Sequence, residues 1–203
     1  MNLRKLERRW FLGISALILI SAFASEASAQ AEHVRWDIVS VTPTPAPGTI
    51  GPGGHASARA NDHTKITVTG EGTFVAPAGG AGTSGAATGG GLWTTFDATG
   101  TVVTGTGTYE VTGLVRWEPA PGTPPPPTDT IDDGTLSAGL AVLRILYSDG
   151  ARGVLVVSCH LIGTPDSVFE GITASKGFVD YWNREAPAPG VNADRTAFHI
   201  MNE

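Results

Sequence analysis

Residues 140–161 read LAVLRILYSDGARGVLVVSCHL, and this stretch decides the class of fold. Two apolar runs, 140–147 and 154–161, flank a short polar segment that contains two glycines. Runs of this length, rich in Val, Leu and Ile and separated by a turn, are typical of two antiparallel strands. Because both runs are almost continuously apolar, we expect the hairpin at the centre of the fold, covered on both faces.

The rest of the chain also favours strands. The 203 residues include 27 Gly and 14 Pro, and no long stretch shows the 3.6-residue period of an amphipathic helix. We therefore expect an all-β fold with little helix, arranged as a small antiparallel β-barrel, with a two-sheet β-sandwich as the alternative. Further strands are expected at residues 34–41, 56–60, 64–75, 92–97, 101–118, 168–173, 178–182 and 195–201.

An internal repeat favours strong curvature in this sheet. VTGEGTF at residues 68–74 recurs as VTGTGTY at residues 103–109. Alternating glycines inside a strand mark bends, or places where an aromatic ring or another backbone packs closely. We therefore expect the two copies at equivalent, sharply curved positions, and such curvature favours the barrel.

The first 29 residues have the order of a secretory signal. A basic start at residues 4–9 precedes an apolar run at 10–24 and then Ala27-Ser28-Ala29, which supplies the small residues that a signal peptidase needs. Cleavage is expected between Ala29 and Gln30. The protein is then exported, to the periplasm or the extracellular space.

The export route stays open between two alternatives. The segment RRWFL at residues 8–12 resembles the twin-arginine signal, although Glu7 stands where that pattern prefers Ser or Thr. An apolar run rich in Leu and Ile is typical of the general route. Its roughly 15 residues fall short of the roughly 20 that span a bilayer, so no stable membrane span is expected after cleavage.

Residues 30–203 are expected to form a single β domain with a net charge of −8, from 9 Lys+Arg and 17 Asp+Glu. No basic run remains in this part, so nucleic acid and anionic membrane surfaces are poor candidates for partners, and no nucleic-acid binding is expected. Mobile Gly/Pro-rich loops are expected near residues 42–54, 77–91, 119–134 and 184–194.

The familiar signatures of catalysis and cofactor binding are missing. The chain lacks the Gly-x-Ser-x-Gly elbow and the Gly-rich loops that bind phosphates or dinucleotides. Cys159 is the only cysteine, so neither an intrachain disulfide nor a multi-cysteine zinc site can form. Cys159 and His160 are neighbours on an expected strand and point to opposite faces, which disfavours a catalytic pair. No cofactor is expected.

The candidate catalytic residues are His160, Glu170 and Arg144. His160 is near the end of an apolar strand, where a histidine is either hydrogen-bonded in the core or lines a pocket; the core position is favoured. Combined with Glu170 or Arg144, it would make a polar cluster in the mouth of a small barrel. Glu170 lies in or beside an expected strand.

The candidate metal ligands are Asp129, Asp132 and Asp133. With the glycine that follows them, they partly imitate a calcium loop. However, Ile131 and Leu140 occupy two positions where that loop needs oxygen ligands, so a solvated acidic turn is favoured. None of the five histidines has the spacing of a usual zinc site.

Two functions from different classes fit these observations. The first is a non-catalytic secreted domain that binds a small apolar ligand within the barrel, or an envelope partner on its surface. The second is a small-barrel enzyme of the isomerase or hydrolase type, which uses the polar cluster described above. A purely structural envelope protein is a third possibility.

Overall fold

The computed structural model describes residues 31–77, 83–131 and 134–201, and this part of the chain is all-β. It contains no helix, and therefore none long and apolar enough to cross a membrane. The expected signal segment lies outside the described residues. Twelve strands form one antiparallel sheet: β1 (Glu32–Ile38), β4 (Ala56–Arg59), β5 (Lys65–Val68), β6 (Glu71–Ala76), β7 (Gly90–Phe96), β8 (Val103–Ala120), β10 (Thr135–Tyr147), β11 (Arg152–Cys159), β12 (Gly171–Lys176), β13 (Val179–Tyr181), β14 (Asn183–Arg184) and β15 (Thr196–Ile200).

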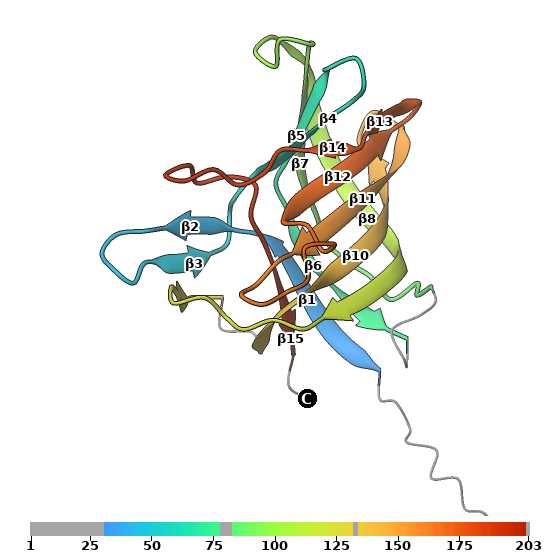
Figure 1. The fold of residues 1–203 in the computed structure, drawn as a ribbon. Helices are drawn as coiled ribbons and strands as arrows, with labels where there is room; N and C mark the ends of the chain where they lie inside the picture. The colour runs from blue at the N-terminus through green and yellow to red at the C-terminus, as the bar shows by residue number, and fades with distance from the viewer. Residues whose placement is uncertain (1–30, 78–82, 132–133, 202–203) are drawn as a thin grey trace, which may run out of the picture.

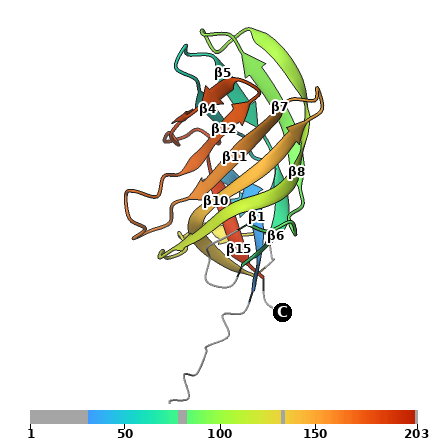
Figure 2. The ribbon, with the colours of Figure 1, turned by 90° about the vertical axis from the view of Figure 1, so that its right-hand side faces the viewer.

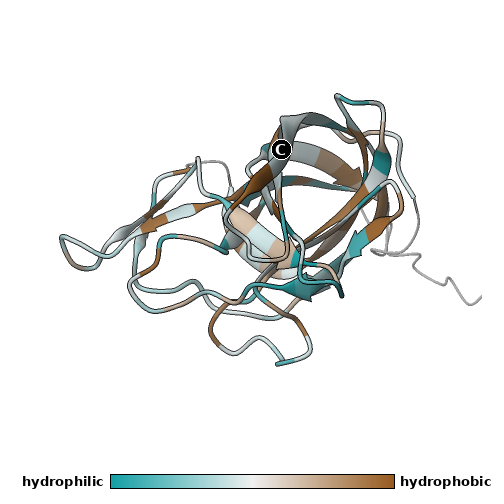
Figure 3. Ribbon diagram, turned by 90° about the horizontal axis from the view of Figure 1, so that it is seen from above, coloured by the Kyte–Doolittle hydropathy of each residue, from teal (hydrophilic) through white to brown (hydrophobic). Residues whose placement is uncertain are grey.

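Six of these strands are hydrogen-bonded to one another in a closed ring. The order β10–β15–β1–β6–β7–β8 returns to β10, because the long strand β8 pairs with both β7 and β10. The other six strands continue the sheet from β10 and from β7. The strands are strongly curved and surround the core (Figures 2 and 3).

The central hairpin predicted from residues 140–161 is confirmed, but it is not buried on both faces: along β10, Leu143 and Ile145 are buried, whereas Arg144 between them is exposed. β10 and β11 pair in a register that places Leu143 opposite Leu155, and β10 also pairs with β8 along most of its length. The closing strand expected near residue 195 is present as β15. It pairs with both β1 and β10.

Aromatic side chains occupy the core between the strands of the ring. Trp117 packs edge-on against Phe198 with ring centroids 4.7 Å apart, and Phe74 lies 5.4 Å from Trp117. The expectation that repeat glycines lie against aromatic rings is confirmed. A Cβ atom on Gly72 would stand 2.8 Å from Nε1 of Trp36, and one on Gly107 would be equally close to Nε1 of Trp93.

The two repeat copies are not equivalent, however. The first copy is divided between β5 and β6, whereas the second lies entirely within β8. The break falls at Thr69 and Gly70, because β5 pairs with β4 and β7 while β6 pairs with β1. The expected strand 64–75 is therefore two strands.

The strand expected at 168–173 begins only at Gly171. The preceding residues form a turn, in which the carbonyls of Val168 and Phe169 accept hydrogen bonds from the side chains of His160 and Ser158. These side-chain bonds replace the ladder that a strand would need.

A second, three-stranded sheet packs beside β1 and β15. It consists of β2 (Ser40–Thr42), β3 (Thr49–Gly51) and β9 (Thr128–Asp129), with β2–β3 antiparallel and β3–β9 parallel. The loops expected at 42–54 and 119–134 thus each contain a short strand. In Figure 1 the β2–β3 hairpin projects to one side, between the connection that follows β8 and the connection that precedes β15.

A small apolar cluster joins this sheet to the ring. Val39, Ile50, Ile131 and Ala197 are buried together, apart from the main core. Asn192, in the connection before β15, accepts a hydrogen bond from the Val41 amide and donates one to the Ser40 hydroxyl.

A polar cluster is buried on the same side of the ring. The His199 ring is fully buried, and its Nε2 lies 2.6 Å from a carboxylate oxygen of Asp129. Its Nδ1 lies 4.0 Å from Asp37 Oδ2 and has no hydrogen-bond partner among the described residues. Arg35 donates two hydrogen bonds to the buried Asp37 and one to Glu71.

Candidate functional site

Three segments that are far apart in the sequence bring polar side chains together at one end of the sheet. His160 directly follows β11, Glu170 directly precedes β12, and Arg195 directly precedes β15. The antiparallel pairing of Ser158 with Gly171 returns the chain from β11 to β12 at this end. The Thr196 hydroxyl donates to the Ser158 carbonyl at 2.6 Å, which fixes the start of β15 beside β11.

The Glu170 carboxylate is held by backbone donors from the two other segments. The amide of His160 donates to Oε2 at 2.6 Å, and the amide of Thr196 donates to Oε1 at 2.7 Å. The residue keeps some exposed surface, but its carboxyl group is closely surrounded by protein. Both oxygens are therefore oriented by main chain rather than by a cationic side chain.

Burial raises the pKa of Glu170 to about 7. The backbone donors and the charge of Arg195 act in the opposite direction, but the loss of solvation outweighs them. At neutral pH the carboxyl group therefore exists in both its protonated and its ionised form. A group with this property can donate or accept a proton.

The His160 ring is fixed in one tautomer by a carbonyl oxygen. Nδ1 lies 2.7 Å from the oxygen of Val168. A carbonyl can only accept, so Nδ1 carries the proton and the neutral ring has its lone pair on Nε2. No described residue hydrogen-bonds to Nε2. This nitrogen is therefore open to a bound molecule.

Arg195 is held through its backbone and leaves its charge unpaired. Its carbonyl accepts from the Val39 amide, and the preceding Asp194 accepts from the Ser57 amide through its side chain. Asp194 has a positive φ of 58°, so the chain turns sharply just before Arg195. The guanidinium forms no ion pair or hydrogen bond with any described side chain. Nearby, the Arg184 guanidinium lies over the Phe169 ring, 5.6 Å from its centroid.

Two hollows meet at this cluster. One is an apolar cavity of about 230 Å³ between the three-stranded sheet and the ring; the other is a wider polar cleft of about 520 Å³. His160, Glu170 and Arg195 line both. The apolar cavity is otherwise lined by Val39, Val41, Ile50, Pro125, Pro127, Leu136, Cys159, Leu161, Thr196 and Ala197. The cleft adds Asp166, Val168, Phe169, Arg184, Ala186 and Pro187.

Of the three candidate catalytic residues, the structure brings His160 and Glu170 together and places Arg144 elsewhere. Arg144 is exposed in the middle of β10 and lines a separate hollow of about 210 Å³ with Thr112 and Arg152. Its guanidinium lies over Gly113, where a Cβ atom would be 2.6 Å from an Arg144 nitrogen.

The three candidate metal ligands give no cation site in the described residues. Asp132 and Asp133 lie outside them, and Asp129 directs its carboxylate to His199 and to the Ile131 amide. Across the described ranges, no group of three or more His, Cys, Asp or Glu side chains is arranged to hold a metal ion.

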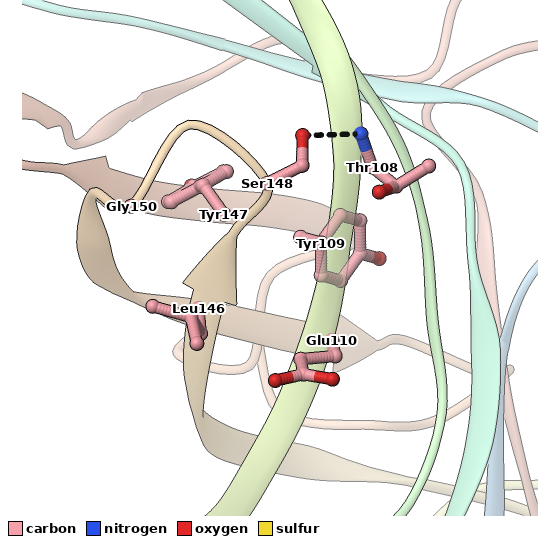
Figure 4. Close-up of a pocket in the computed structure, with 7 residues that line it drawn as sticks. All are labelled: Thr108, Tyr109, Glu110, Leu146, Tyr147, Ser148 and Gly150. Carbon is pink, nitrogen blue, oxygen red and sulfur yellow. Dashed lines mark hydrogen bonds between the residues drawn. The ribbon is translucent and has the colours of Figure 1, made fainter.

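A further hollow lies at the turn of the central hairpin (Figure 4). Three of the five polar side chains that line it are already hydrogen-bonded within the protein, whereas those of Thr108 and Glu110 have no hydrogen-bond partner among the described residues. The hydroxyls of Tyr109 and Tyr147 donate to the carbonyls of Thr69 and Ser175, and the Ser148 hydroxyl accepts from a backbone amide. Most of these polar side chains are therefore engaged within the protein rather than free for a ligand.

Sequence reasoning missed Arg195 and the apolar wall contributed by the proline-rich connections. Arg195 appeared only as the first residue of the closing strand, and its residue type carried no further signal.

Comparison with known proteins gives no match, since no family model, no curated protein and no solved structure is similar to this chain.

Proposed function

We propose that this protein binds a small, largely apolar organic molecule in the cavity between the three-stranded sheet and the ring. The observation that carries the proposal is the meeting of an apolar cavity with a polar cluster in which His160 Nε2 and the Arg195 guanidinium have no hydrogen-bond partner among the described residues, while Glu170 is held by two backbone amides. Ligand sites in proteins are typically apolar hollows with a few convergent polar groups. The cavity fits that description better than the hollow at the hairpin turn does.

The size of the cavity limits the ligand. Drug-sized ligands occupy roughly 300–1,000 Å³, and the apolar cavity measures about 230 Å³. The apolar part of the ligand is therefore small, on the scale of a medium-length alkyl chain or a single ring. The wider cleft receives the polar end, which contacts solvent.

The proposal includes two finer points about the molecule as a whole. The ring of six paired strands favours a small antiparallel barrel over a two-sheet sandwich, since the ladder of hydrogen bonds closes on itself. The basic and apolar order of the first 29 residues favours export, to the periplasm or the extracellular space.

Filling the cavity tests this function. Val41 is only partly buried and lines the apolar wall, so Val41→Trp places an indole in the cavity with little disturbance of the core. Isothermal titration calorimetry with 1-octanol is expected to show binding to the natural protein and at least tenfold weaker binding to this variant. Val102→Trp adds the same side chain on an exposed turn and should bind like the natural protein. Equal affinity in all three proteins would refute the proposed cavity.

A second candidate function is supported by the tautomer of His160. A lone pair on Nε2 that faces the cleft, beside a carboxyl group with a pKa of about 7, is an arrangement suited to general acid–base catalysis. An enzyme of the hydrolase type would release 4-nitrophenolate from 4-nitrophenyl octanoate, and His160→Gln would abolish the release while 1-octanol still binds. Absence of ester hydrolysis by the natural protein would remove this form of the candidate.

A further inference from the structure

We propose that the ligand is an organic monocarboxylate whose negative charge is bound by Arg195. This inference rests on the ligand-binding function proposed above and names the chemical class of the molecule. It follows from how charge is distributed around the two hollows, because the Arg195 guanidinium at their junction forms no ion pair with any described residue.

Two arginines line these hollows, and neither is paired with a carboxylate of the described residues. Arg195 lines both hollows and makes no ion pair within the described residues. Among the described residues, the Arg184 guanidinium on the cleft side contacts the Phe169 ring and the Glu170 carbonyl and pairs with no carboxylate. An arginine presents a planar fork of donors that matches a carboxylate in two parallel hydrogen bonds. The unpaired guanidinium at the mouth of an apolar cavity is thus a suitable anchor for such a group.

Glu170 does not itself fully neutralise the charge of Arg195. Its two oxygens already accept hydrogen bonds from the His160 and Thr196 amides. Burial also raises its pKa to about 7, so at neutral pH it compensates the Arg195 charge only in part. A ligand carboxylate therefore supplies the negative charge that the site lacks.

The lining of the site limits the ligand to a single negative charge. Asp166 also lines the cleft, and its carboxylate repels a dianion such as a phosphate monoester more strongly than a monoanion. Apart from the polar cluster, the walls of the inner cavity are mainly apolar, and the Thr196 hydroxyl among them already donates to the Ser158 carbonyl. One charge on a short apolar body fits both parts of the site.

The test compares ligands that share one alkyl chain and differ in the head group. Sodium octanoate, 1-octanol and octyl phosphate are titrated into the natural protein by calorimetry. We expect octanoate to bind about tenfold or more tightly than 1-octanol, as a hydrogen-bonded charge pair implies. Octyl phosphate is expected to bind more weakly than octanoate.

Variants then assign the difference to one side chain. Arg195→Gln should reduce the affinity for octanoate to that for 1-octanol, and should leave 1-octanol binding unchanged. Arg144→Gln is the matched control, since Arg144 is an exposed arginine that lines a different hollow. If Arg144→Gln weakens octanoate binding as much as Arg195→Gln does, general electrostatic attraction explains the preference and the proposal is overturned.

The outcomes separate this inference from the function on which it rests. If 1-octanol binds as tightly as octanoate and Val41→Trp blocks both, the cavity is a ligand site but the carboxylate is not recognised. Tighter binding of octyl phosphate would likewise overturn the monocarboxylate and keep the cavity. If none of the three compounds binds the natural protein, the proposed function itself fails.

Discussion

Two clusters in this protein combine a histidine, carboxylates and an arginine, and they differ in what surrounds them. Around His199, Asp129 hydrogen-bonds to the ring Nε2 and Asp37 pairs with Arg35. The ring is fully enclosed, and its Nδ1 lies 4.0 Å from Asp37 without a hydrogen-bond partner among the described residues. Around His160, the carboxylate is held by backbone amides instead. The histidine Nε2 and the nearby guanidinium have no partner in the described part of the protein.

The same residue types build a structural cluster in one place and the proposed binding site in the other. The His199 cluster joins the three-stranded sheet to the ring, because Asp129 comes from β9 while His199 comes from β15. Its groups face each other, and the His199 ring has no exposed surface that a ligand could reach. The His160 cluster leaves its groups facing two hollows, which is the arrangement expected of a binding site. Residue types alone do not distinguish the two.

The largest expected effect is on stability, at the His199 cluster. Asp37→Ala removes the carboxylate that accepts two hydrogen bonds from Arg35, and leaves that guanidinium partly buried beside His199. We expect the free energy of unfolding to fall by about 3 kcal/mol, as when one partner of a buried pair is lost. Urea denaturation measures it. Asp149→Ala, which breaks an exposed pair with Lys176, should have a much smaller effect. Similar losses of unfolding free energy in the two variants would contradict the structural role assigned to the buried His199 cluster.

The next largest effect is a pH dependence of stability that originates at Glu170 in the His160 cluster. The pKa of Glu170 is about 7 in the folded protein and lies near 4.5 in an unfolded chain. Between these values the folded state binds more protons, so stability falls as pH rises from 4.5 to 7. With allowance for partial exposure, we expect a loss of about 2 kcal/mol.

The Glu170→Gln variant has no titrating group at position 170, so its free energy of unfolding should lack this part of the decline between pH 4.5 and 7. The two proteins are compared by urea denaturation at pH 4.5, 6 and 7.5. Burial also raises the pKa of Asp37, which contributes a decline in the same direction to both proteins and cancels in the comparison. Parallel pH profiles for the natural protein and the variant would show that Glu170 is not the titrating group.

The smallest expected effect is the contrast between the two histidines. His199→Asn leaves a void in a buried site and shortens the reach to Asp129, whereas His160→Asn keeps an N–H donor for the Val168 carbonyl. We expect the first variant to be less stable than the second by about 1–2 kcal/mol. Thermal or urea unfolding of both, side by side, measures the difference. The reverse order would assign the structural role to His160.

The central hairpin was predictable because its signal is local. The apolar runs on either side of residues 148–153 specify a hairpin without reference to the rest of the chain, and β10 and β11 confirm it. The three-stranded sheet was not predicted. Its members are two or three residues long and lie in proline-rich connections, so they show no alternation that a pattern search can detect.

The candidate site was predictable only in part. His160 and Glu170 stood out as polar residues beside an apolar strand, and the β11–β12 pairing brings them together. Arg195 joins them through the pairing of β15 with β10 and β1, a non-local contact that the sequence near residue 195 does not encode. Arg144 was a candidate of the same kind, but the alternation of β10 turns it outward, away from the cluster.

The most direct test of this account is a two-dimensional ¹H–¹⁵N NMR titration of the protein with sodium octanoate. The amides of His160 and Thr196 both donate to Glu170, so they report on any molecule that enters at the junction of the two hollows. The account predicts that these two amides, with those of the apolar wall near Val41, show the largest saturable shifts. Largest shifts at Thr108 and Ser148, beside the hollow in Figure 4, or no saturable shifts at all, would contradict it.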